Sequence, residues 1–217
     1  MSDVPAPNPL TPVFVTEIYR AELVEPDADF LFKHLEFACL KMAAEHSEGR
    51  AWSANNNYIG YTSFGTILSL RDYAPVFEDL FRIIDSHVAT FAKLLEIDIR
   101  GKTLVLQDSW INVLGPNGGH SSHMHPLSLF SGTVYISIPA GASGIYFEDP
   151  RTPLMMHSPP RLPTARADRQ GAAAFAPARG TVLLWESWLR HEVPQNPADD
   201  VRISISFNYD AVRPTAP

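Results

Sequence analysis

Three sequence features that would indicate a class of function are scarce or missing in this chain: cysteines, clusters of basic residues and long apolar runs. It contains a single cysteine, Cys39, so no disulfide within the chain is possible, and we expect a reducing, cytoplasmic location. It has no cluster of lysine and arginine, and its net charge of −7 argues against nucleic acid as the main partner. It has no apolar run that approaches the length of a membrane span, so we expect no membrane partner either.

The composition that is present predicts a folded chain with a sizeable core. Hydrophobic residues make up 45% of the 217 residues and charged residues 19%, which argues against a disordered protein. We expect a flexible Pro-rich start at residues 1–12, without the pattern of a signal peptide, and a single domain over 13–217. Within that domain, 13–101 is expected to be helical support with short strands, and 102–210 a catalytic core. Residues 149–169 hold five prolines and four arginines, and we expect a mobile loop there.

Two helices are predicted in the first half of the chain. Asp27 is a good N-cap for the first helix, and Gly49 is the expected stop. The second helix is expected to begin near Asp72 and to carry Pro75 in its first turn. Each helix has apolar residues recurring at steps of three and four, which predicts one buried face. These residues are Leu31, Leu35, Cys39 and Met42 in the first helix and Phe77, Leu80, Phe81, Ile84, Val88, Phe91 and Leu95 in the second. Between the helices, 51–70 suggests short strands with turns.

The second half of the chain predicts a sequence of short strands separated by turns. The Gly-rich run 115–119 favours a turn that no regular element can cross. The expected strands are 104–114, 128–138, 144–147, 171–176, 181–188 and 201–209. Short strands at this spacing after a helical block are typical of a double-stranded β-helix, or jelly roll. The predicted fold class is therefore α+β, mainly β, with a jelly-roll core braced by N-terminal helices.

The last expected strand has two chemically different faces. Arg202, Ser204, Ser206 and Asn208 alternate with Ile203, Ile205 and Phe207. The polar face could lie in water on the outside of a sheet, or it could point into a barrel that binds a polar ligand. The sequence leaves both interpretations open.

Three histidines form the candidate metal site. His123 and His125 are separated by one residue, so on an extended strand their side chains point to the same side. His191 follows the apolar strand 181–188. Three neutral imidazoles from two strands can occupy one face of a divalent metal and leave the opposite positions open. We therefore predict His123, His125 and His191 as metal ligands and catalytic residues.

The other histidines favour simpler roles. His120 lies in the Gly-rich turn, where we expect a loop residue or a neighbour of the ligands. Each of the remaining four is isolated in the sequence, so a surface or satisfied core position is the better interpretation. These four are His34, His46, His87 and His157.

Several stretches in the second half resemble the Fe(II)- and 2-oxoglutarate-dependent dioxygenases. The order of His, one residue, a second ligand position, a distal His and then Arg-x-Ser is similar to that superfamily. More closely, the chain resembles a prolyl-hydroxylase-like group of these oxygenases whose substrates are not settled. The matching stretches are SWINV at 109–113, HMHP at 123–126, FSGTVY at 130–135, FEDPR at 147–151 and RISISFN at 202–208. The resemblance extends over residues 104–209 and implies a jelly-roll oxygenase of hydroxylase type.

The resemblance also implies a cosubstrate site. By it, His123 and His191 correspond to the two iron-binding histidines, and Arg202 to the residue that grips the distal carboxylate of 2-oxoglutarate. Ser204 would support the same carboxylate, and Tyr135 matches a strand position where related prolyl hydroxylases place a tyrosine on the cosubstrate. Asn112, on the preceding strand, is expected to reach this pocket. The implied cofactors are Fe(II), 2-oxoglutarate and O2.

One position departs from the superfamily. Most of these dioxygenases have Asp or Glu where this chain has His125. Glu148 and Asp149 are the nearest acids that could substitute, and we expect both at the far rim of the barrel, because the strand before His191 should end near the starts of its neighbours. The predicted site is therefore a three-histidine site with His125 as the third ligand.

Two other functions stay open at this point. A three-histidine site also suits a cupin-like metal enzyme that does not use 2-oxoglutarate, and such sites can bind zinc. A barrel that binds a metal without catalysis is the third possibility. The expected partner is a small-molecule or peptide substrate, and the broad apolar helices could support a homodimer.

Overall fold

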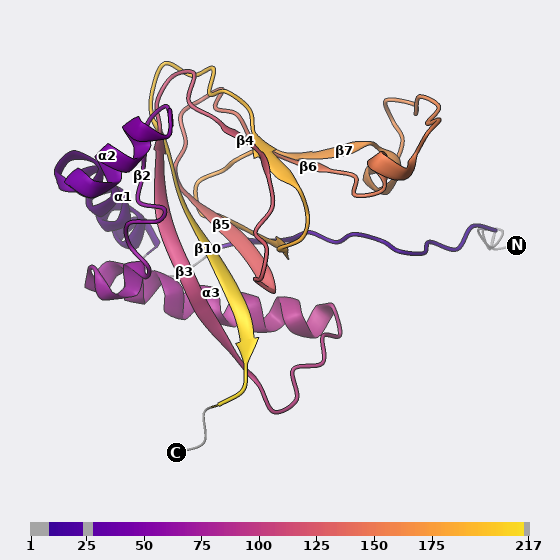
Figure 1. Cartoon of the computed structure of the whole chain (residues 1–217), viewed down its shortest axis with the longest axis horizontal. Helices are drawn as coiled ribbons and strands as arrows, with labels where there is room; N and C mark the ends of the chain where they lie inside the picture. Colours follow the sequence, from indigo (N-terminus) through magenta and orange to yellow (C-terminus); the bar gives the residue numbers. More distant parts are fainter. Residues whose placement is uncertain (1–8, 24–27, 215–217) are drawn as a thin grey trace, which may run out of the picture.

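The computed structural model describes residues 9–23 and 28–214. Two antiparallel sheets face each other, and the helices lie against the outer face of the larger one (Figure 1). The larger sheet has the order β1-β8-β5-β10-β3-β2, and the smaller has the order β4-β9-β6-β7. Their bounds are β1 Tyr19–Glu22, β2 Tyr61–Thr62, β3 Thr103–Leu114, β4 His120–His123, β5 Phe130–Ser137, β6 Ile145–Glu148, β7 Ala172–Phe175, β8 Thr181–Glu186, β9 His191–Val193 and β10 Arg202–Val212. This arrangement is the predicted jelly roll with helices on one side.

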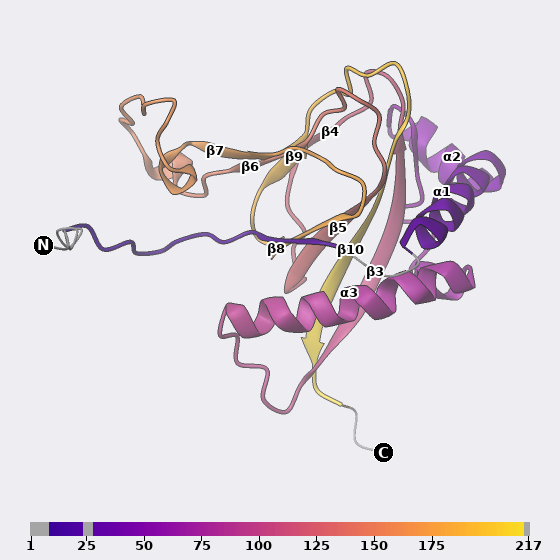
Figure 2. The same ribbon diagram turned by 180° about the vertical axis from the view of Figure 1, so that it is seen from behind.

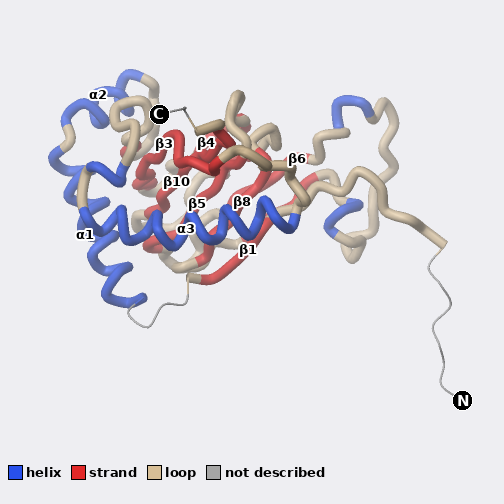
Figure 3. The backbone as a smooth tube through the Cα atoms, turned by 90° about the horizontal axis from the view of Figure 1, so that it is seen from below, coloured by secondary structure: helices blue, strands red, loops and turns tan. Residues whose placement is uncertain are grey.

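The helices are α1 Ala28–Glu45, α2 Ser47–Asn55 and α3 Pro75–Leu94. Helix α3 begins with Pro75 at its first turn, as predicted, after a short 3-10 turn at Leu70–Asp72. It crosses the outer face of the larger sheet (Figure 3). All but one of the predicted stripe residues of α3 are fully buried there, and Leu95 packs at the edge of the same core. Each such side chain stabilises the fold by about 1.5–3 kcal/mol, so the apolar face of α3 is a major source of stability.

The prediction for the first helix and the segment after it was partly wrong. Asp27, the expected cap, lies outside the described residues. Gly49 does not end a helix but lies inside α2, and a Cβ there would come within 2.7 Å of His46 and 2.8 Å of Tyr61. The glycine therefore permits close packing of α2. Residues 51–55 are helical, and β2 is the only strand that the structure has between 51 and 70.

Strands β1 and β9 were not expected from the sequence, and β4 was expected only as the extended segment that carries His123 and His125. These three strands have three or four residues each. They are too short to carry a readable alternation of polar and apolar residues. Two of them, β4 and β9, hold the histidines discussed below.

The two faces of β10 point to different environments. Ile203, Ile205 and Phe207 are fully buried in the core between the larger sheet and the helices. Arg202 and Asn208, on the other face, are also buried, at 2% and 5% exposure, but between the two sheets. Of the two interpretations above, the polar face points into the barrel.

One hairpin extends away from the barrel. Strands β6 and β7 continue into residues 149–171, which contain short 3-10 turns at Thr152–Leu154 and Ala167–Arg169. Figure 2 shows this hairpin and the segment before β1 extending to the same side, away from α1 and α2. No helix in the described part of the chain is long and apolar enough to cross a membrane.

Candidate metal centre

The smaller sheet brings the three predicted ligands together. His123 is the last residue of β4 and His191 is the first of β9, and the two are paired directly across the strands. One ring nitrogen from each of His123, His125 and His191 lies within 4.8 Å of the others. Within the described residues, this is the one group of histidines, cysteines and acids close enough to share a metal ion.

His125 reaches the group differently from the expectation. Strand β4 ends at His123, so His125 is not on the same strand. Its backbone N–H instead donates to the carbonyl of Ser187 at 3.0 Å, which ties the loop after β4 to the end of β8. Its ring lies 5.1 Å from each of the rings of His123 and His191 and 5.5 Å from Trp110. The three rings converge through this loop contact, not through strand alternation.

Each of the three rings has an acceptor at Nδ1. The Nδ1 of His123 lies 2.7 Å from the carbonyl of Ser121, and that of His191 lies 3.0 Å from the carbonyl of Leu189. The Nδ1 of His125 lies 2.6 Å from the side-chain oxygen of Asn208. A ring that donates from Nδ1 carries its lone pair on Nε2, which is the form that binds a metal.

The histidines are also held in the neutral form. Burial lowers the pKa of His125 to about 4 and that of His191 to about 3, and the neighbouring imidazoles add to the effect. Burial also lowers the pKa of His123, although the carbonyl of Ser121 opposes this. Three neutral imidazoles with free Nε2 lone pairs fit a divalent metal such as iron or zinc.

His120 lies beside the group without belonging to it. It is the first residue of β4, not a turn residue, and its ring is 4.5 Å from His123 and 5.3 Å from Tyr58. Burial lowers its pKa to about 4. It therefore lines the barrel next to the three ligands.

No carboxylate joins the histidines among the described residues, but the reason differs from the expected one. His191 starts β9 and is paired with Phe147, so Glu148 is one residue from the site and not at the far rim. Its side chain points to the outer face, because side chains alternate along β6, and its carboxylate lies 3.5 Å from Arg190. Asp149 is bound by Arg151 at 2.8 Å, which keeps the pKa of this carboxyl below its usual range.

A buried arginine lies in the same barrel interior. Arg202 is 2% exposed, and its guanidinium lies 5.1 Å from the ring centre of Tyr135. In the part of the chain that the structure describes, Arg202 donates a long hydrogen bond of 3.4 Å to the hydroxyl of Ser204, and its Nε has no partner. None of the ion pairs between described residues includes Arg202. A buried cation without an acid costs several kcal/mol, so this side chain fits an anionic ligand.

The other predicted cosubstrate residues surround this arginine. Tyr135 is fully buried and its hydroxyl has no hydrogen-bond partner in the described structure. Ser204 and Tyr135 are paired across β10 and β5, and Ser204 and Asn112 across β10 and β3. The structure therefore brings Arg202, Ser204, Tyr135 and Asn112 together on neighbouring strands of the larger sheet.

Two polar residues of this region were missed. The hydroxyls of Tyr58 and Thr62 each donate to the side-chain oxygen of Asn112 at 3.1 Å. Burial raises the pKa of Tyr58, and the nearby charge of Arg202 opposes this. They belong to the segment before α3, whose sequence has no periodic pattern that would have pointed to the barrel.

Two tryptophans wall the histidines. Trp185 is 2% exposed, and its ring lies 4.8 Å from His191 and 5.1 Å from Phe147. Its Nε1 is a third buried polar atom without a partner in the described residues. Trp110 is 4% exposed, and its ring lies 5.5 Å from His125. Each tryptophan therefore covers one imidazole of the triad.

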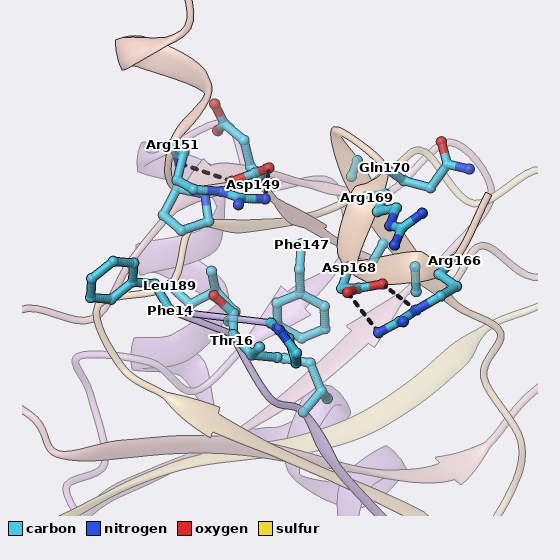
Figure 4. A pocket seen from close by; sticks show the side chains of 18 of the residues that line it. Phe14, Thr16, Phe147, Asp149, Arg151, Arg166, Asp168, Arg169, Gln170 and Leu189 are labelled. Carbon is cyan, nitrogen blue, oxygen red and sulfur yellow. Dashed lines mark hydrogen bonds and ion pairs between the residues drawn. The ribbon is translucent and has the colours of Figure 1, made fainter. Parts of the chain in front are cut away.

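A separate cavity of about 840 Å³ lies beside the barrel, between the extended hairpin and the segment before β1. Figure 4 shows Phe147 at its centre, with the Asp149–Arg151 and Asp168–Arg166 ion pairs on its walls. No histidine of the triad is among the described residues that line it, and Phe147 lies between it and His191. The cavity adjoins the barrel without opening on the triad.

Comparison with known proteins gives one family. Residues 108–208 match a sequence model described as "Putative 2OG-Fe(II) oxygenase". This segment contains His123, His125, His191 and Arg202. No curated protein matches the chain by sequence.

Solved structures show the same fold at low sequence identity. A prolyl-4-hydroxylase from Pseudomonas putida has a TM-score of 0.54 at 15% identity, over 90% of this chain and 88% of that one. The viral collagen prolyl hydroxylase vCPH from Paramecium Bursaria Chlorella virus-1, in its 2OG complex, has a TM-score of 0.56 at 11% identity, over 90% and 96%. The epimerase SnoN, in complex with Fe3+, alpha ketoglutarate and nogalamycin RO, has a TM-score of 0.59 at 12% identity, over 93% and 83%. These likenesses support the jelly-roll assignment.

Proposed function

Because the chain belongs, over residues 108–208, to the family of 2OG-Fe(II) oxygenases, we propose that His123, His125 and His191 hold Fe(II) in this enzyme. The support is the convergence of their ring nitrogens within 4.8 Å and the acceptor that each ring has at Nδ1. All three ligands are neutral, whereas most of the superfamily has one carboxylate. Such a site keeps one more positive charge on the metal.

Arg202 is proposed to bind the distal carboxylate of 2-oxoglutarate. The observation that carries this proposal is a buried guanidinium without an acid partner in the described residues, in the same barrel interior as the histidines. A guanidinium offers two parallel N–H donors to a carboxylate, which an ammonium cannot do. Ser204 and Tyr135 would add hydroxyl donors to the same ligand, and Asn112 would support the pocket through Tyr58.

When bound, Fe(II), 2-oxoglutarate and O2 supply the oxidising power for hydroxylation of a C–H bond. The chain's part is to orient and to exclude water. The Nδ1 acceptors hold the imidazoles in the binding tautomer. Trp110 covers His125, and Trp185 and Phe147 cover His191. Arg202 fixes the far end of the cosubstrate.

The test is succinate formation from 2-oxoglutarate by protein loaded with iron without oxygen and then exposed to air. We expect succinate from the wild-type protein and none from Arg202→Met, at equal iron content. Arg100→Met is the matched control, because that arginine is exposed and pairs with Asp98. The proposal is wrong if iron-loaded wild-type protein does not bind 2-oxoglutarate even at high concentration.

A second candidate is a three-histidine metal enzyme that does not use 2-oxoglutarate. The absence of an acid among the convergent histidines favours it, because such sites also suit zinc. It predicts that Arg202→Met changes turnover little. If the barrel binds a metal without catalysis, neither the wild-type protein nor Arg202→Met will show turnover.

The substrate is proposed to be a small molecule or a peptide, as expected of a hydroxylase-type oxygenase. Residues 149–169, beside the cavity in Figure 4, are the proposed mobile loop for its capture. We propose further that 13–217 acts as one domain in the cytoplasm, without nucleic-acid or membrane partners. Exposed apolar side chains on α1, such as Phe30 and Phe37, are candidates for a homodimer face.

A further inference from the structure

A chain of hydrogen bonds links His125, the proposed ligand that stands where most of the superfamily has an acid, to Asp108. The Nδ1 of His125 lies 2.6 Å from the side-chain oxygen of Asn208, and the amide nitrogen of Asn208 donates to the carboxylate of Asp108 at 2.7 Å. Asp108 and Asn208 are directly paired across β3 and β10. Asn208 is 5% exposed, so its amide has little access to water.

The carboxylate sets the direction of the amide. Asp108 accepts hydrogen bonds and cannot donate when ionised, so the NH2 group of Asn208 must face it. The amide oxygen then faces His125, and this oxygen can only be an acceptor. His125 must therefore carry its proton on Nδ1 and keep the lone pair of Nε2 for the metal. Asp108 thus selects the tautomer of His125 through the side chain of Asn208, which lies between them.

The serine next to the amide reinforces this arrangement. The hydroxyl of Ser131 lies 2.7 Å from the oxygen of Asn208, 2.8 Å from Nδ1 of His125 and 2.7 Å from the hydroxyl of Ser187. Both serines are fully buried. The Asn208 oxygen thus accepts from Ser131 on the side of His125, and the hydroxyl of Ser131 is itself held by Ser187.

His125 differs in this respect from the other two ligands. The Nδ1 atoms of His123 and His191 face backbone carbonyls that lie two residues away in the chain, at Ser121 and Leu189. Those acceptors carry no charge and are fixed by local geometry. Only His125, which stands where most of the superfamily has an acid, is bound by a side chain that leads to a carboxylate in the described structure.

We propose that Asp108 is a positioning residue that acts through the Asn208 amide on His125, and that it supplies indirectly the negative charge that a carboxylate ligand would supply directly. The proposal rests on the proposed function, because it takes His125 as a metal ligand. The amide transmits polarisation: an ionised acceptor strengthens the Asn208 dipole, and its oxygen then binds the N–H of His125 more strongly. A more strongly bound N–H makes the opposite nitrogen a better donor to a cation.

The test is the affinity of the metal-free full chain for Co(II), followed by the visible absorption of the bound ion. Changing a side chain that supports a ligand usually weakens metal binding by about 10–100-fold. We expect Asp108→Asn to weaken Co(II) binding about 10-fold and Asp108→Ala at least as much, with the absorption band of three nitrogen ligands retained. Asp98→Asn is the matched control, because Asp98 is exposed and pairs only with its neighbour Arg100 in the described residues. It should bind Co(II) like the wild type.

A swap separates charge from structure. In the double variant Asp108→Asn with Asn208→Asp, the new amide donates to the new carboxylate, which then accepts directly from His125. We expect Co(II) affinity to return at least to the wild-type value, although the same two side chains have been changed. A role for Asp108 in stability alone predicts lower melting temperatures in the variants with unchanged Co(II) affinity.

Two results would overturn the inference. One is wild-type Co(II) affinity in Asp108→Asn and Asp108→Ala. The other is a folded swap variant that binds Co(II) no better than Asp108→Asn. Wild-type protein that binds no Co(II) would instead remove the proposed metal site itself, so the two failures are distinguishable.

Discussion

The two ends of the barrel interior differ in how fully their polar side chains are satisfied. At the histidine end, which comprises His123, His125 and His191, every Nδ1 has an acceptor between 2.6 and 3.0 Å away. At the arginine end, which comprises Arg202 and Tyr135, the Nε and the phenol hydroxyl are buried without a partner in the described structure. The protein itself orients the three imidazoles but leaves Arg202 and Tyr135 with unmet donors, and one more unmet donor, the Nε1 of Trp185, lies beside His191.

This difference separates two tasks that one pocket has to perform. A metal site gains from ligands that are already oriented, because the orientation then costs nothing when the ion binds. A donor set for an organic anion cannot be satisfied internally and still bind the anion strongly, since the internal acceptor would compete. The unmet donors cost stability in the free protein, and such costs are tolerated at functional sites.

The strongest way to break the comparison is to remove a histidine. His191→Ala should abolish stoichiometric Fe(II) or Co(II) binding and reduce activity by about a thousandfold or more, because two imidazoles alone hold a divalent ion weakly. His157→Ala, at an exposed histidine of the extended hairpin, is the control and should retain full binding. Metal content is measured after dialysis against a weak chelator. Stoichiometric metal in His191→Ala would remove this residue from the ligand set.

The next largest effect is expected at the arginine end and has two parts of opposite sign. Arg202→Met should lower 2-oxoglutarate affinity about 100-fold, the cost of a lost charge-assisted pair. The same change should raise the stability of the free protein by about 2 kcal/mol, because a buried unpaired cation is removed. That gain corresponds to a rise of about 4–8 °C in melting temperature for a chain of this size.

Calorimetry with 2-oxoglutarate and thermal melts of the metal-free protein measure the two parts. Co(II) affinity should not change in Arg202→Met, because this side chain is not among the ligands. A drop in the melting temperature of the free variant would mean that Arg202 is satisfied by the protein, and the contrast between the two ends would be lost.

Lowering the pH tests the histidine end, because its hydrogen bonds and its metal-binding form require neutral rings. Burial lowers the pKa of His125 to about 4 and that of His191 to about 3, whereas an unfolded chain has a value of about 6.5. The unfolded state therefore gains protons first as the pH falls. The stability of the metal-free protein is fully present above pH 6.5 and is lost progressively toward pH 4, by at most about 1.4 kcal/mol per histidine for each pH unit.

Denaturant titrations between pH 7.5 and 5 check this prediction. His125→Asn should show a shallower fall than the wild type, because one of the titrating rings is gone. An unfolding free energy that is constant over this range would contradict the lowered pKa values of the triad.

The sequence predicted the side-chain types of both ends better than their geometry. The alternation of Arg202, Ser204 and Asn208 with apolar residues predicted that they share one face of a strand. It left open whether that face points into the barrel, and the role of Arg202 came from the resemblance to the dioxygenases. The convergence of His123 and His125 was expected from the same rule but arises from a loop contact to Ser187. Alternation fails there because β4 stops after four residues.

Long-range features were beyond prediction for a physical reason. The placement of Glu148 depends on which residue starts β9, and a strand of three residues has no periodic signal. The sequence predicts a helix stop at Gly49, because it does not show that His46 and Tyr61 approach this glycine inside α2. The link from Asp108 to Asn208 joins residues that are 100 positions apart, so only the fold reveals it.

The smallest predicted effect tests whether the arginine end is one unit or a single charge. Tyr135→Phe removes only the buried hydroxyl that has no partner among the described residues, and burial raises the pKa of this phenol, so it stays a donor. One neutral hydrogen bond contributes about 0.5–1.5 kcal/mol, so 2-oxoglutarate affinity should fall about fivefold. The free variant should be as stable as the wild type or slightly more stable, because no existing hydrogen bond is lost. Tyr146→Phe, on the outer face of β6, is the control and should change neither value. If Tyr135→Phe binds 2-oxoglutarate as tightly as the wild type, then Arg202 binds the ligand without this hydroxyl, and the contrast with the histidine end reduces to one unpaired charge.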